Sequence, residues 1–250
     1  MTIANQAAKS MTAGLSPASS SAPRTPTTQF KYYDLIMAAF VAVLLCSSFM
    51  GPSKVAEIGG VHFGAASLFF PISYIFGDIL TEVYGYARAR RVVWMGFAAL
   101  IFGSIMAALV VALPAAPEWK HQAAFETVFG ATWRVALASI LGFWAGELVN
   151  SYVLAKLKIR TQGRLLWLRT ISSTLIGEGV DTMIFFPIAL YGILPDALLV
   201  SIMLTNYVIK CAWEILATPA TYAIVSALKR VEGVDHYDRD TNFSPFVVSV

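Results

Sequence analysis

Long apolar stretches separated by short polar ones dominate the chain. Six of them stand out, at residues 33–51, 65–84, 92–113, 129–154, 171–193 and 197–227. Each has about the 20 residues that an α-helix needs to cross the hydrocarbon core of a bilayer, or more. The pattern therefore predicts an all-α integral membrane protein with six transmembrane helices.

Composition supports this interpretation. Of the 250 residues, 57% are apolar and only 13% are charged, and the mean hydropathy is +0.66, which is too apolar for a water-soluble domain. We divide the chain into a leader at 1–31, a six-helix domain at 32–230 and a tail at 231–250. The leader is rich in Ser, Thr, Ala and Pro and has no long apolar run, so we expect it to be disordered.

Basic residues gather on one side of the predicted helices. They lie before the first helix, after the second, between the fourth and fifth, and after the sixth: Lys9, Arg24, Lys31, Arg88, Arg90, Arg91, Lys156, Lys158, Arg160, Arg164, Arg169, Lys229 and Arg230. Because Lys and Arg near helix ends are retained in the cytoplasm, we expect leader and tail to be cytoplasmic. The net charge of +3 follows from this asymmetry and gives no reason to expect a nucleic-acid partner.

Two connections have patterns of their own. The stretch "KVAEIGGVHFG" places two β-prone runs on either side of Gly59-Gly60, which predicts a short β-hairpin on the outer face. The stretch "KLKIRTQGRLLWLRT", at 156–170, mixes basic residues with leucines and a tryptophan. It is typical of an amphipathic segment that lies on the cytoplasmic face against anionic lipid.

Four of the predicted helices carry polar side chains within the apolar stretch. Residues three or four positions apart share a helix face, so each helix presents its polar groups together. Together with the aromatic residues on the same faces, the sets are Phe70, Tyr74, Asp78 and Glu82; Trp144, Glu147 and Asn150; Glu178 and Asp181; and Asn206, Lys210 and Glu214.

Such groups cannot face lipid, because one Asp or Lys at a helix centre costs about 2.5–3.5 kcal/mol even on lenient insertion scales. We therefore expect them to converge on a shared interior. There Lys210 can neutralise one carboxylate, either Glu214 in its own helix or an acid across the bundle. The other acids either stay protonated and join helices, or bind a ligand rich in hydrogen-bond donors or positive charge. Glu82 lies near the arginines within 88–91, which leaves open an ion pair there or a ligand role.

Four segments together resemble the bacterial queuosine precursor transporter family, also grouped as vitamin uptake transporters. The resemblance covers about residues 32–229 and is carried by "FFPISYIFGDILTEVYGYARARRVVWMGF", "GELVNS", "KLKI" and "WLRTISSTLIGEGVDTMIFFPIA". It implies a six-helix inner-membrane carrier that imports the 7-cyano or 7-aminomethyl form of 7-deazaguanine. It also implies a fold similar to the substrate-binding subunits of energy-coupling-factor transporters.

A deazaguanine offers an N1 hydrogen and a 2-amino group side by side, which one carboxylate accepts together, and its flat ring system stacks on aromatic side chains. An aminomethyl group adds a cation for a second acid. We expect Glu178 or Asp181 at the guanine edge, Asn150 at the carbonyl, Glu147 and Asp78 as polar walls, and Phe70, Tyr74 or Trp144 for stacking, with Asn206 and Lys210 completing the site. No cofactor or metal is expected, and a homodimer or an energy-coupling partner is left open.

The sequence also bears on two other function classes, a channel and an enzyme. A cation or proton channel is consistent with an acid-lined interior, but the scattered aromatic residues argue against it. An intramembrane enzyme is disfavoured because the histidines, His62, His121 and His236, all fall outside the apolar stretches, so no histidine-based nucleophile or metal site forms in the bundle.

Overall fold

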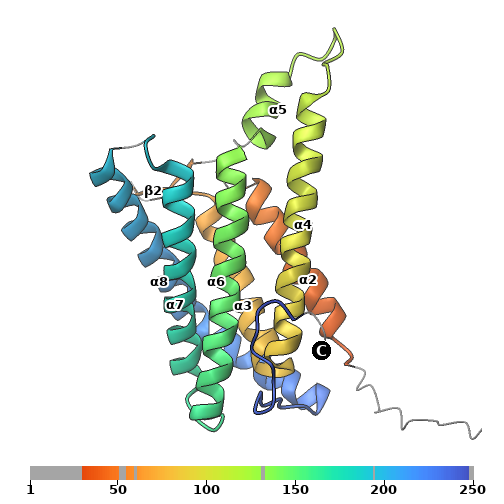
Figure 1. Cartoon of the computed structure of the whole chain (residues 1–250), viewed down its shortest axis with the longest axis vertical. Helices are drawn as coiled ribbons and strands as arrows, with labels where there is room; N and C mark the ends of the chain where they lie inside the picture. The colour runs from red at the N-terminus through yellow and green to blue at the C-terminus, as the bar shows by residue number, and fades with distance from the viewer. Residues whose placement is uncertain (1–29, 51–54, 59–60, 131–132, 194, 248–250) are drawn as a thin grey trace, which may run out of the picture. The chain divides into compact units, whose positions relative to one another are not determined.

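The computed structural model describes residues 30–50, 55–58, 61–130, 133–193 and 195–247, and the account below is confined to them. Figure 1 shows the helices and strands along the chain. The helices are α2 (Tyr33–Met50), α3 (Ala66–Tyr84), α4 (Tyr86–Ala112), α5 (Gln122–Phe129), α6 (Trp133–Arg160), α7 (Leu166–Leu190) and α8 (Asp196–Glu232), and the strands are β1 (Val55–Ile58) and β2 (Val61–Gly64).

Each of the six apolar stretches overlaps one long helix. By length and composition, four helical stretches can cross a membrane. Three of them are α4, α7 and α8, and the fourth is the longer stretch of which α6 is a part. The chain is therefore a multi-pass helical membrane protein. Helices α2 and α3 are shorter, with 18 and 19 residues, and α3 carries two acids. Six spans accordingly remain a prediction.

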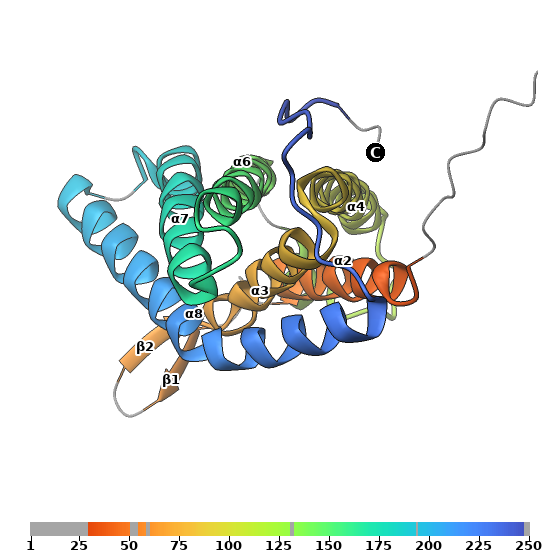
Figure 2. The same ribbon diagram turned by 90° about the horizontal axis from the view of Figure 1, so that it is seen from below.

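Helix α3 packs against α2, α4, α6 and α8, and α6 packs along α7. In the view of Figure 2, α3 lies among these helices, in agreement with its packing against four of them. Tyr74, Asp78 and Glu82 of α3 are accordingly fully buried. The position of α3 explains why a helix with two carboxylates is tolerated, because its polar groups face protein on all sides that the structure describes.

The predicted hairpin corresponds to a two-stranded antiparallel sheet. Strands β1 and β2 pair with Val55 opposite Gly64 and Ile58 opposite Val61. The Gly59-Gly60 connection, on which the hairpin prediction depends, lies outside the described residues.

The prediction of an amphipathic segment lying on the membrane surface at 156–170 is wrong. Helix α6 continues to Arg160, a tight turn follows, and α7 begins at Leu166. The turn uses left-handed backbone at Gln162, Gly163 and Leu165, where only the glycine adopts that conformation without strain. Two of the basic residues assigned to a lipid-facing surface, Lys158 and Arg169, are instead buried between helices.

The residues that follow α8 return to the bundle as a C-terminal strap, which we define as residues 234–247. Asp238 of this strap is buried, and both of its carboxylate oxygens accept hydrogen bonds from the backbone N–H of Tyr86, at 3.1 and 3.0 Å. Tyr86 is the first residue of α4, and Gly85 before it provides no side chain to cap the helix. A carboxylate at a helix N-terminus satisfies a free N–H and opposes the positive end of the helix dipole.

Further contacts fix the strap along α4. Arg90 donates to the carbonyl oxygens of Asn242 and Ser244, at 2.6 Å each, and the Trp94 indole donates to that of Pro245 at 2.8 Å. Since these are bonds to backbone oxygens, they depend on the path of the strap more than on its side chains. The strap is therefore an integral part of the described fold.

Asp235 joins the strap to two other helices. Its carboxylate accepts hydrogen bonds or ion pairs from Lys158 of α6 at 2.7 Å and from Lys229 of α8 at 2.8 Å. Partial burial by itself raises the pKa of Asp235, but the two lysines outweigh it and hold that pKa below its usual value. Asp235 is thus ionised at neutral pH and holds the ends of α6 and α8 together.

Replacing Asp238 by alanine removes the only carboxylate described at the start of α4. We expect Asp238→Ala to lower the free energy of unfolding by about 1–2 kcal/mol, the usual cost of losing a helix cap. Thermal unfolding of the detergent-purified protein measures this loss of stability as a lower Tm. The matched control is Asp240→Ala, which removes an exposed carboxylate two residues away. Equal Tm values for the two variants would contradict the capping role.

Candidate functional site

Five acids from four helices meet inside the bundle. They are Asp78 of α3, Glu147 of α6, Glu178 and Asp181 of α7, and Glu214 of α8, and none of these residues is more than 4% exposed. The convergence predicted from the polar helix faces is therefore present. Their surroundings differ, however, and the difference separates structural from candidate binding groups.

Glu82 lies one turn beyond Asp78 and belongs to a separate ion cluster. Arg169 of α7 donates two hydrogen bonds to its carboxylate, at 2.7 and 2.9 Å. Lys158 lies 3.5 Å and Lys229 lies 2.5 Å from Glu82 Oε1. A buried carboxylate held by a bidentate guanidinium and two ammonium groups is fully compensated. Of the two roles predicted for Glu82, an ion pair or a contact with a ligand, the structure shows the ion pair. Its partners, however, are not the arginines within 88–91.

Lys210 of α8 holds two of the five acids. Its ammonium donates to Glu178 Oε2 at 2.8 Å and to Asp181 Oδ2 at 2.6 Å. The same nitrogen lies 4.4 Å from the centre of the Phe70 ring, within cation–π distance. The partner of Lys210 is therefore across the bundle, which was one of the two alternatives, and is not Glu214 on its own helix.

The other three acids have few partners. Asn150 donates to Asp78 Oδ1 at 2.8 Å. Both carboxyl oxygens of Glu147 and of Glu214 are buried without a hydrogen-bond partner among the described residues, and so are Asp78 Oδ2, Asn150 Oδ1 and the Tyr74 hydroxyl. Buried polar groups are nearly always satisfied in proteins, so a group of unsatisfied ones marks a place where something else binds.

Glycines let these groups come close. A Cβ atom on Gly77 would lie 1.7 Å from Glu147 Oε1, and one on Gly142 would lie 2.5 Å from Asp181 Oδ1. A Cβ on Gly146 would lie 2.6 Å from the Tyr74 hydroxyl oxygen and 2.9 Å from the carbonyl oxygen of Gly177. Small residues that permit close helix approach are typical of membrane interfaces. Here they also leave room for the carboxyl groups.

Two residues of the predicted site are not brought to the acids by any described contact. Trp144 faces α4 and the strap, where its ring contacts Trp94, Phe97 and Phe246. The amide nitrogen of Asn206 donates to the Ile202 carbonyl at 3.0 Å, one turn earlier in α8. Their assignment to the site stays an untested prediction, and neither enters the site proposed below.

The sequence-based site omitted Glu214 and the unpartnered buried hydroxyls of Thr174 and Thr182. In the sequence, Glu214 belongs to the polar face of its helix and is one of the two alternative partners of Lys210. Its four-residue step from Lys210 and from Thr218 was the signal for its position on the inner face of α8. The threonines gave no signal, because threonine is common in apolar helices.

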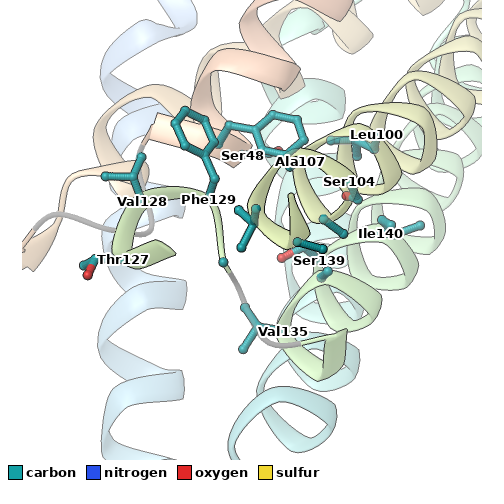
Figure 3. A pocket seen from close by; sticks show the side chains of 16 residues that line it. Ser48, Leu100, Ser104, Ala107, Thr127, Val128, Phe129, Val135, Ser139 and Ile140 are labelled. Atoms are coloured by element: carbon teal, nitrogen blue, oxygen red, sulfur yellow. The ribbon is translucent and has the colours of Figure 1, made fainter. Parts of the chain in front are cut away.

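A cavity of about 510 Å³ lies elsewhere, between α2, α4, α5 and α6. Figure 3 shows its wall, in which Leu100, Val128, Phe129 and Ile140 surround a few serine and threonine hydroxyls. None of the candidate site residues lines it. Within the described part of the chain, no three His, Cys, Asp or Glu side chains are grouped so as to hold a metal ion.

Comparisons with known proteins agree with the sequence pattern. The family model described as "Putative vitamin uptake transporter" matches residues 64–224. The chain is 34% identical over 171 residues to the "Probable queuosine precursor transporter" of Bacillus subtilis (strain 168), which covers 68% of this chain and 75% of that protein. It is 25% identical over 203 residues to the "Queuosine precursor transporter" of Escherichia coli (strain K12), covering 80% and 88%. No solved structure matches significantly, so the likeness to energy-coupling-factor subunits remains untested.

The glycines of α7 give a matched pair of variants. A Cβ on Gly177 would lie 2.8 Å from both the Asn150 Cβ and the backbone oxygen of Gly146, whereas a Cβ on Gly179 would have its nearest neighbour 3.9 Å away. We expect Gly177→Ala to lower the free energy of unfolding by about 1–3 kcal/mol through overpacking, and Gly179→Ala to cause no loss. Thermal unfolding in detergent compares the two. Similar stability of both variants would contradict the close approach of α6 and α7.

Proposed function

Since the chain belongs to the vitamin uptake transporter family, we propose that it carries queuosine precursors, the 7-cyano or 7-aminomethyl form of 7-deazaguanine, into the cytoplasm. The relatives are named as transporters of queuosine precursors. The observation that carries the proposal at the level of residues is the set of buried, unsatisfied acceptors on α3, α6 and α8.

The ligand chemistry matches these acceptors. A deazaguanine edge offers two adjacent N–H donors, and a carboxylate with two unoccupied oxygens accepts both. Glu147 has two such oxygens, and Asn150 on the same helix has an unpartnered amide oxygen for a further donor. Phe70 and Tyr74, whose ring centres lie 5.9 Å apart, supply aromatic faces beside the acids.

This assignment differs from the one based on sequence alone. Glu178 and Asp181 were expected at the guanine edge, but Lys210 already occupies an oxygen of each. We therefore assign the guanine edge to Glu147, with Asp78 and Asn150 next to it. The triad of Lys210, Glu178 and Asp181 forms a charge-compensated wall of the site.

We also propose six membrane-spanning helices, with α2 and α3 as the first two, in the bacterial inner membrane with both termini cytoplasmic. The ion cluster supports this orientation. Lys158, Arg169 and Lys229 come from the ends of α6, α7 and α8 and meet around Glu82 near the end of α3. Basic residues thus gather at one end of the helices, which is the end retained in the cytoplasm. The leader at 1–31 and the tail at 231–250 lie on that side in this proposal.

Uptake into proteoliposomes that contain only this protein tests the function. We expect the wild type to take up labelled 7-deazaguanine, and Glu147→Gln to reduce the initial rate roughly tenfold or more, because a hydrogen bond to a charged acceptor is worth about 1.5–3 kcal/mol. Glu118→Gln, which changes an exposed acid in the loop before α5, is the matched control and should transport normally.

Two results would contradict the proposal. Absence of uptake by the wild type, or ion flux without added purine, would remove the transporter assignment in favour of a channel. Normal uptake by both Glu147→Gln and Asp78→Asn would leave the function standing but remove the assigned site.

A further inference from the structure

The inner acids divide into a compensated and an uncompensated group. In the first, one lysine is shared by two carboxylates at 2.6 and 2.8 Å. The second consists of three carboxyl groups with no described cation in hydrogen-bond contact, namely Asp78, Glu147 and Glu214. The proposed function uses Glu147, with Asp78 beside it, and leaves Glu214 without a role.

Glu214 shares with Glu147 the lack of a described partner for either carboxyl oxygen, but it has no role in the function proposed above. It lies one turn after Lys210 on α8, has 1% of its side chain exposed, and has no partner for either carboxyl oxygen. The hydroxyl one turn further along, that of Thr218, does not serve it. That hydroxyl donates instead to the backbone oxygen of Glu214, at 2.8 Å.

The charged and titratable groups that face Glu214 are nearly all acidic. Its carboxyl group interacts electrostatically with those of Asp78 on α3, Glu147 on α6 and Glu178 on α7, and with the Cys211 thiol on α8. Around these lie the Tyr74 hydroxyl, Asp181 and Lys210. The lysine is the cation described in this group, and its ammonium is already directed at Glu178 and Asp181.

A second observation indicates a ligand here. The Tyr74 hydroxyl and Asn150 Oδ1 are fully buried and lack partners, so the group of acids is accompanied by a neutral donor and a neutral acceptor that nothing in the described chain satisfies. Packing alone does not explain such groups, because an unsatisfied buried polar atom costs about 1–3 kcal/mol.

An ionised carboxylate in this position would lack both water and a counter-charge. Burial of an unpaired charge is far more costly than binding a proton, so Glu214 in these surroundings is neutral by protonation. A ligand that brings a cation reverses this preference, since an ammonium beside Glu214 compensates the ionised form.

Building on the function proposed above, we propose that Glu214 exchanges a proton for the ammonium group of the 7-aminomethyl ligand. The ammonium enters, the carboxyl proton leaves to solvent, and the net charge of the site stays the same. The neutral 7-cyano ligand has no such partner for Glu214. Glu214 therefore sets the selectivity for the aminomethyl form, whereas Glu147 serves the ring common to both.

Binding of the two ligands to the purified full-length protein tests this role. We expect Glu214→Gln, which imitates the neutral acid, to weaken binding of 7-aminomethyl-7-deazaguanine roughly tenfold to a hundredfold, the equivalent of one charged hydrogen bond, and to leave binding of the 7-cyano form unchanged. Titration calorimetry measures both affinities. Glu118→Gln is the control and should match the wild type for both ligands.

Proton release provides a second measurement that needs no variant. In weakly buffered solution at neutral pH, the wild type should release about one more proton per bound aminomethyl ligand than per bound cyano ligand, as linkage between ligand and proton binding requires. In Glu214→Asp, which keeps a carboxyl group, the additional release should persist.

The outcomes separate the two proposals. Equal proton release with both ligands, or an equal loss of both affinities in Glu214→Gln, overturns the role of Glu214 while the transport function stands. Failure of the wild type to bind either ligand overturns the proposed function and this inference together.

Discussion

A carboxylate that leaves water must find a cation, hydrogen-bond donors or a proton, and this requirement governs how the helices of this protein meet. Glu82 finds Arg169 and two lysines, which come from three other helices. Glu178 and Asp181 find Lys210. Because each partner comes from a different helix, the pairs restrict the rotation of α3, α6, α7 and α8 about their axes. Contacts between apolar side chains alone restrict rotation far less in a lipid environment.

The same requirement explains what distinguishes the candidate site from the structural ion cluster. Around Glu82 the cations outnumber the acids, since three basic side chains meet Glu82 and Asp235. In the group of acids around Glu147, the carboxyl groups outnumber the cations, because Lys210 is the cation described there. The same helices place three cations around Glu82, whereas Asp78, Glu147 and Glu214 have no described cation in hydrogen-bond contact. The deficit is therefore best understood as the place of a ligand that supplies donors and positive charge.

Part of this arrangement was predictable from sequence. Apolar length located the long helices, and four-residue steps such as that from Tyr74 to Asp78 identified the faces that converge. These features depend only on residues close in the chain. The family was also recognisable, because its motifs are continuous stretches of sequence, and the comparisons confirm it.

Pairing between helices was predicted poorly. Arg169 is 87 residues from Glu82, and its choice over the nearby arginines within 88–91 depends on how α7 lies against α3. Likewise, nothing local shows that Trp144 contacts Trp94 instead of an acid. Helix rotation and crossing decide such contacts, and they result from the whole bundle. The atoms that Gly146 admits, the Tyr74 hydroxyl and the Gly177 carbonyl oxygen, likewise come from α3 and α7 and are not evident from the sequence around Gly146.

The C-terminal strap has a consequence for how the protein is made. Its contacts hold the start of α4 and the ends of α6 and α8, yet it follows every described helix in chain order. A ribosome delivers these helices to the membrane before it synthesises the residues that join their ends. The contacts between the strap and these helix ends can therefore form only after synthesis has reached the strap, so completion of this end of the bundle is a late event in biogenesis.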